Sequence, residues 1–154
     1  MAEKKSMTVK SNIKVVTGRI KQQLEQLKNK EFLLRPVAIE VIPLMTERIH
    51  QKGKASDDSQ IGTYSSGYLK LRQKKYKRDA STRVIVSLTR QLENNWSVIA
   101  TQNGYGIGFI NPFNLQKARW VEGSKGKTIF SLSKSEKQYA TDRINELVAD
   151  ALNS

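Results

Sequence analysis

The residues most able to do chemistry are a cluster of cations and tyrosines between positions 64 and 78. Lysine and arginine side chains bind phosphate oxygens, and tyrosine rings stack on nucleic-acid bases. Equally, such a cluster can be a solvated basic arm that becomes ordered against an acidic protein, and composition alone favours neither interpretation. The aromatic density is low for a stacking platform, and no named nucleic-acid motif is present. The candidate interface residues are Tyr64, Tyr68, Lys70, Arg72, Lys74, Lys75, Tyr76, Lys77 and Arg78.

A catalytic or metal site is not expected. His50 is the only histidine, and a lone imidazole near the end of a helix is far more often a surface or capping residue than a catalyst. Asp57 and Asp58 are the only adjacent acids, but the residues after them do not fit a calcium loop, which indicates a solvated turn. The absence of cysteine excludes disulfides, thiolate nucleophiles and cysteine-based zinc sites. We expect no cofactor.

Composition points to one domain with an acidic partner. A chain of 154 residues is long enough for a single core. Its net charge of +13 is concentrated in residues 1–30 and 70–83, which carry +6 each. Concentrated basic charge favours nucleic acid, an anionic membrane or an acidic protein surface. No apolar run approaches the roughly 18 residues of a membrane span, and the polar N-terminus lacks a secretion signal, so an intracellular origin is the default.

Helices are predicted for the first third of the chain. Residues 1–11 are polar, so a flexible N-terminus is expected. Apolar residues then recur every three or four positions over 13–27, as on one face of an amphipathic helix. Residues 31–52 have a broad apolar face and should form the central core helix, with Pro36 and Pro43 causing a kink or a late start. The segment 53–82 is predicted as an extended basic loop or arm, with a short helix over 65–74.

An antiparallel sheet and a closing helix should follow. β-Branched runs predict strands at 83–88 and 128–132, with a short helix at 90–95. Gln102-Asn103-Gly104 between two apolar runs predicts a hairpin of 96–101 and 105–110. Gly104, Gly106 and Gly108 do not fit a dinucleotide-binding fingerprint and indicate a bulge or a close backbone approach. Residues 114–120 form another short helix or loop. Ser133 and Glu136 form a capping box for a helix over 134–152.

The predicted architecture is α+β over a single domain, 1–154. N-terminal helices precede a small antiparallel sheet with an Asn-Gly hairpin, and the C-terminal helix packs on that sheet.

Four segments together resemble a known family. Thr46–Gly53 ends a helix, Asp57–Tyr68 and the basic segment follow, Val84–Leu92 combines a strand with Leu-Thr-Arg-Gln-Leu, and Phe130–Glu136 leads into the last helix. This order and spacing is similar to the bacteriophage virion-morphogenesis or tail-completion proteins, in versions from phages of the Bacteroides group. The resemblance covers roughly residues 37–152.

The resemblance implies a non-enzymatic structural subunit, made in the host cytoplasm and located in the neck or tail of the virion. Such subunits form a homo-oligomeric ring between portal and tail and contact the portal and other ring proteins. The ring surrounds a channel in which packaged DNA could be touched, and no membrane is involved. On this interpretation residues 54–78 reach a neighbouring subunit or ring, and the helix over 31–52 and the last helix pack behind the sheet. The alternative is a sequence-indifferent nucleic-acid-binding protein that uses residues 70–78.

Overall fold

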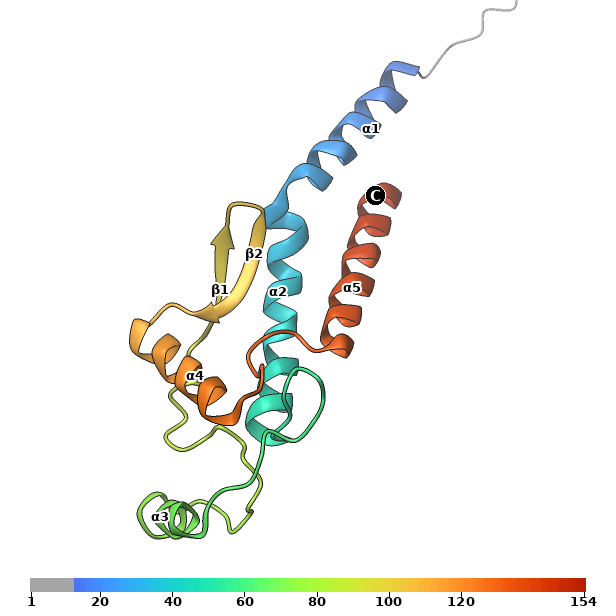
Figure 1. Ribbon diagram of the computed structural model, residues 1–154. Coiled ribbons are helices and arrows are strands. Elements are labelled where there is room, and N and C mark those ends of the chain that lie inside the picture. Colours follow the sequence, from blue (N-terminus) through green and yellow to red (C-terminus); the bar gives the residue numbers. More distant parts are fainter. Residues whose placement is uncertain (1–12) are drawn as a thin grey trace, which may run out of the picture.

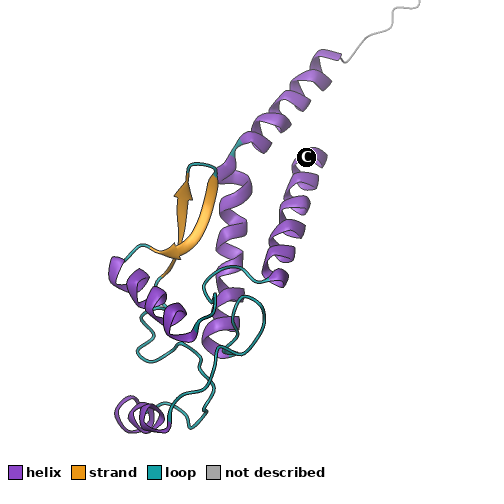
Figure 2. Ribbon diagram, viewed as in Figure 1, coloured by secondary structure: helices purple, strands orange, loops and turns teal. Residues whose placement is uncertain are grey.

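The structure, a computed structural model, describes residues 13–154, except for the side chain of Ile13. The flexible N-terminus expected over 1–11 lies outside this range. The elements are α1 (Ile13–Lys28), α2 (Lys30–Thr46), the π-helical turn η1 (Glu47–Gln51), α3 (Ser66–Tyr76), β1 (Trp96–Thr101), β2 (Gly104–Phe109), α4 (Pro112–Lys125) and α5 (Lys134–Asn153). This confirms the α+β class. Figure 1 shows an elongated molecule with α1 and α3 at opposite ends, and Figure 2 shows the long loops around α3.

Helix α2 is the centre of the core. Val37, Val41 and Met45 on α2, followed by Ile49 on η1, recur every four residues and are almost fully buried, as an amphipathic core helix requires. The helix begins at Lys30, capped by the Asn29 side chain, and continues through both prolines, so the late start does not occur.

The last helix reaches the core from the other side of α2. Helix α5 packs along α2 and α1, while the hairpin packs on the opposite side of α2 (Figure 1). The prediction that the C-terminal helix lies on the sheet is therefore wrong in this detail. The capping box of Ser133 and Glu136 is confirmed, and no helix in residues 13–154 has the length and apolar character to cross a bilayer.

The predicted hairpin is present, with its turn shifted by one residue. Thr101 pairs with Gly104, so Gln102 and Asn103 form the turn. Neither turn residue has a positive φ, and the expected Asn-Gly turn is wrong. Gly104 is already part of β2, where a Cβ would lie 3.0 Å from Cδ1 of Leu34 on α2. The glycine thus permits a close approach of strand and helix, and the regular register leaves no bulge.

The other two predicted strands do not form. Arg83 makes only an isolated bridge with Thr63, and the run breaks at Val86, whose φ is 45°. Residues 128–132 have no ladder either. Both segments nevertheless supply core side chains, Val84 and Ile129. Their β-branched pattern therefore marked burial, which irregular backbone also provides.

One predicted helix is absent, and two helices have other bounds than predicted. Residues 90–95 form a turn closed by a bond from Asn94 N to Arg90 O (3.0 Å), not a helix. Helix α3 ends at Tyr76. Helix α4 is longer than expected because Asn111 caps its start, Pro112 occupies its first turn and Gly126, with φ 61°, ends it.

Candidate binding site

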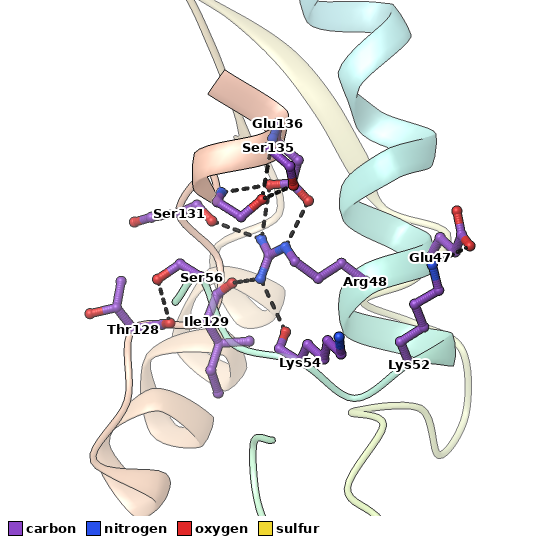
Figure 3. A network of polar contacts seen from close by, with 11 residues as sticks. Glu47, Arg48, Lys52, Lys54, Ser56, Thr128, Ile129, Ser131, Ser135 and Glu136 are labelled. Carbon is purple, nitrogen blue, oxygen red and sulfur yellow. Dashed lines mark hydrogen bonds and ion pairs between the residues drawn. The ribbon is translucent and has the colours of Figure 1, made fainter. Parts of the chain in front are cut away.

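The π-helical turn η1 directs two buried polar side chains to opposite parts of the molecule. Arg48 lies toward α5 and is only 5% exposed. All five of its N–H groups are used, as Figure 3 shows: Nε and Nη2 bind the carboxylate of Glu136, at 2.7 and 3.2 Å, and the remaining bonds go to backbone carbonyls. Those carbonyls belong to Lys54, Ile129 and Ser131. Arg48 thereby ties α2, the following loop and the start of α5 together.

His50 points the other way and is buried as well. Its Nδ1–H donates to the carbonyl of Val86 (3.0 Å), and its Nε2 accepts the indole N–H of Trp96 (3.2 Å). Burial lowers the pKa of His50 below its ordinary value, so the neutral ring is favoured. The surface or capping role predicted for His50 is wrong. The histidine instead connects β1 to the irregular segment after Val84.

The first part of the predicted arm is built into the core. Ala55 and Ile61 are buried, and Lys127 Nζ donates to Ser59 Oγ (2.8 Å) across the loop. Asp57 is exposed and accepts bonds from Ser59 Oγ (2.5 Å) and Ser59 N (3.0 Å); the hydroxyl bond first, and then the backbone bond, lower the pKa of its carboxyl group. The Asp57–Asp58 pair thus forms the solvated turn that was expected.

Some of the nine candidate interface residues lie at the surface, and others are directed into the protein. The four lysines Lys70, Lys74, Lys75 and Lys77 lie exposed on α3 and at its end. Tyr68 is just over one-third exposed and Tyr76 is half-buried. Arg78 turns inward and donates twice to the carbonyl of Leu88, at 3.0 and 2.8 Å.

Arg72 is the residue that the sequence interpretation placed wrongly. It was assigned to a segment too charged to be buried, yet it is 1% exposed. Its guanidinium stacks on the Tyr64 ring, 4.3 Å from the centroid, and lies 6.0 Å from that of Tyr68. These rings supply an attractive surface for the cation. The interval of four between Tyr64, Tyr68 and Arg72 was a signal for this contact.

The cation–π contacts do not satisfy the hydrogen bonding of Arg72. Its Nε and Nη2 are buried and have no partner within residues 13–154. A buried charged donor without a partner is costly. The ring of Tyr64 alone does not provide a hydrogen-bond acceptor for Arg72. The hydroxyl of Tyr64 accepts the N–H of Ile85 (3.2 Å) instead. Burial raises the pKa of Tyr64, so it remains a neutral phenol.

A half-open pocket of about 780 Å³ lies against Arg72. Three parts of the chain wall it: the start of α3, the irregular segment 84–92 and the last turns of α4. Its four cations are Arg72, Arg90, Lys117 and Lys125, and no acidic residue lines it. Apolar groups cover most of the remaining wall, including Val86, Leu88 and the exposed Trp120. The arrangement suits an anion that carries apolar groups. We call it the Arg72 pocket.

Exposed apolar residues form a second candidate surface on α1. Val16, Ile20 and Leu24 recur every four residues and are about half exposed. Next to these residues on the same helix, Arg19 Nε and Gln23 Nε2 donate to the carbonyls of Ser154 (3.0 Å) and Leu152 (2.9 Å) at the end of α5. We call Val16, Ile20 and Leu24 the α1 stripe.

Within residues 13–154, no group of three or more histidine, aspartate and glutamate side chains is arranged to hold a metal ion. Comparisons of the chain with protein-family models, curated proteins and solved structures find no match in any of the three.

Proposed function

We propose that this protein is a structural subunit of a bacteriophage virion that forms a ring in the neck or tail, between portal and tail, and does its work through protein contacts. The carrying observation is the α1 stripe. Together with the resemblance to virion-morphogenesis and tail-completion proteins, it favours assembly with copies of the same chain.

The physical argument begins with the marginal stability of a single helix. A helix of 16 residues forms only weakly in water unless its apolar face is packed. Contacts with α2 and α5 cover only part of α1, and the α1 stripe is left in solvent. A neighbouring subunit that covered the stripe would remove this apolar area from water and stabilise the projecting helix.

The test is the oligomeric state of the purified full chain, measured by light scattering after size-exclusion chromatography. The wild type should be a discrete oligomer. Replacing two stripe residues, Ile20→Asp with Leu24→Asp, should give a monomer, because burying two carboxylates in an apolar contact is costly. The matched control is Gln22→Asp with Gln26→Asp, which has the same spacing on the exposed polar face of the same helix.

The control should keep the wild-type oligomer, and the far-UV circular dichroism of both variants should stay helical. A wild type that is monomeric at every concentration would contradict the proposal, as would equal dissociation of both variants. Electron microscopy of phage particles tests the virion location directly: the subunit should occupy a ring between portal and tail.

One observation favours nucleic-acid binding as a second candidate. Lys70 and Lys74 are spaced to share one side of α3, Lys77 follows as the C-cap of this helix, and all three are exposed, as a phosphate-binding surface would be. The buried Arg72 and the inward Arg78 reduce that surface. If this function holds, affinity for DNA should fall steeply with salt, and replacing Lys70, Lys74, Lys75 and Lys77 by serine should abolish it. Under the ring proposal the same four changes should impair incorporation into particles while the subunit stays folded.

A further inference from the structure

We propose that the Arg72 pocket binds an acidic segment of a partner protein, with a carboxylate of that segment on the guanidinium of Arg72 and its neighbouring apolar side chains against Leu88 and Trp120. This binding site goes beyond the proposed ring assembly, because it uses a different surface from the α1 stripe.

Charge is the first argument. The pocket wall contains four cations and no acid, and one of those cations is a buried arginine with two unpartnered nitrogens. The planar guanidinium offers parallel N–H groups that match the two oxygens of a carboxylate. An incoming carboxylate would supply the acceptors that residues 13–154 do not provide.

The apolar wall distinguishes an acidic peptide from nucleic acid. A nucleic-acid strand is usually held in an open groove of exposed cations, with free aromatic faces for its bases. Here the central cation is buried, and one face of Tyr64 is already covered by Arg72 at 4.3 Å. Aliphatic side chains fill much of the wall between the cations, among them Val86, Leu88 and Leu92. A single carboxylate flanked by apolar side chains fits this distribution, and the pocket volume of about 780 Å³ exceeds that of one side chain.

Access to Arg72 requires one ring to move. Nε and Nη2 of Arg72 are buried. Of the two stacked rings, Tyr64 is fixed by its bond to Ile85 (3.2 Å), whereas no hydrogen bond holds the Tyr68 side chain within residues 13–154 and its ring lies farther away, at 6.0 Å. Tyr68 is therefore the side chain that a ligand would displace.

Backbone strain lies in the same wall. Val86 has φ 45° and Arg90 has φ 61°, and both line the pocket. For a β-branched residue such a φ is unfavourable. It is held here by the bond from His50 to Val86. Strain of this kind gathers at binding sites, where the surroundings fix a particular shape.

The experiment uses the full chain labelled with 5-fluorotryptophan, which gives two ¹⁹F signals. Trp120 lines the pocket, whereas Trp96 is bonded to His50 in the core and serves as an internal control. The probe is a pool of blocked pentapeptides, Ala-X-Glu-X-Ala, with X an aliphatic or aromatic residue. The matched pool has Gln in place of Glu. Inorganic phosphate and oligo(dT) are the third and fourth arms.

We expect the Glu pool to shift the Trp120 signal and leave the Trp96 signal in place, with at least tenfold weaker binding of the Gln pool. Arg72→Met should weaken binding of the Glu pool at least tenfold, whereas the control Lys134→Met, exposed on α5 and outside the pocket wall, should change it less than twofold. Equal binding of both pools, absence of binding by the Glu pool, or unchanged affinity in Arg72→Met would overturn the proposal.

Two arms separate other ligands. Saturation by phosphate alone, or Arg72-dependent binding of oligo(dT) that is tighter than that of the peptides, would also overturn it. The comparison of Glu with Gln peptides leaves the protein unchanged, so it stays decisive even if Arg72→Met fails to fold. Light scattering on the same samples reports the oligomer separately, so failure of the ring proposal is recognisable on its own.

Discussion

The two buried arginines of this protein have opposite surroundings. Arg48 uses all five of its N–H groups, two of them on the carboxylate of Glu136. Arg72 lies as deeply buried, but two of its nitrogens have no partner within residues 13–154. The first arginine has everything it needs inside the subunit and contributes to the fold. The second is incomplete within the subunit, which is the property expected of a group that meets its partner on binding.

The largest effect is expected for Arg48→Met. It leaves the carboxylate of Glu136, which is 3% exposed, without its counter-ion, and we expect the free energy of unfolding to fall by about 3–5 kcal/mol. Urea denaturation followed by circular dichroism measures this. The control is Lys52→Met, which removes an exposed ion pair with Glu47 (2.8 Å) and should cost less than about 1 kcal/mol. Equal losses in the two variants would show that Arg48 is not special.

Gly53→Ala tests how the η1 turn, which carries Arg48, is connected to the wall of the Arg72 pocket. Gly53 follows the η1 turn with φ 64°, and a Cβ there would lie 2.2 Å from the carbonyl oxygen of Val84. Val84 lines the Arg72 pocket, so the change should push the pocket wall away from the core and cost about 1–3 kcal/mol. Gly123→Ala is the control, since it has open space within α4 and should be neutral or stabilising by up to about 1 kcal/mol. Thermal unfolding of both variants gives the answer.

Lowering the pH should weaken the connection between η1 and the pocket wall, because it runs through the bond of His50 to Val86. The pKa of His50 is lowered in the folded protein, chiefly by burial, so the unfolded chain takes up a proton first as the pH falls. The contribution of the neutral ring is therefore complete above the ordinary pKa of about 6.5 and is lost below it, with a slope of at most about 1.4 kcal/mol per pH unit. Urea titrations between pH 7.5 and 5 measure this slope. His50→Gln should show a smaller decline over that range, and an identical decline would contradict the assignment.

The smallest effect is expected for Arg72→Met. This change removes the stacking on Tyr64, worth about 0.5–2 kcal/mol, and also removes a buried cation whose desolvation is not compensated. We expect the free energy of unfolding to stay level or rise by up to about 1 kcal/mol, again by urea denaturation. A loss of 3 kcal/mol or more, as for Arg48→Met, would make Arg72 a structural residue and erase the contrast.

Local signals in the sequence predicted most of the elements. The helical period gave α1, α2 and α5, and the capping box gave the start of α5, because each depends on neighbouring residues. The strands expected at 83–88 and 128–132 failed because apolar β-branched runs indicate burial, while a strand also needs a partner. Helix α4 is longer than the predicted segment 114–120 and includes Gly123, because a glycine inside a helix costs only about 1 kcal/mol.

The candidate site was only partly accessible to sequence reasoning. The exposed lysines of α3 lie where a charge argument puts them. The burial of Arg72 was missed although the spacing of Tyr64, Tyr68 and Arg72 indicated it. The burial of Arg48 was missed because it depends on Glu136, which is 88 positions away in the chain. A distant partner leaves no mark on the residues beside an arginine.

A single residue separates α1 from α2, and this has a mechanical consequence. Asn29 accepts the N–H groups of Glu31 (3.0 Å) and Phe32 (3.3 Å), and its own N–H donates to Gln26 (3.1 Å). Because the connection is one residue long and hydrogen-bonded on both sides, α1 has little freedom to rotate relative to α2. A neighbouring subunit that bound α1 would therefore be held at a fixed orientation to the rest of this subunit. The angle at Asn29 would then largely determine the curvature of an assembly.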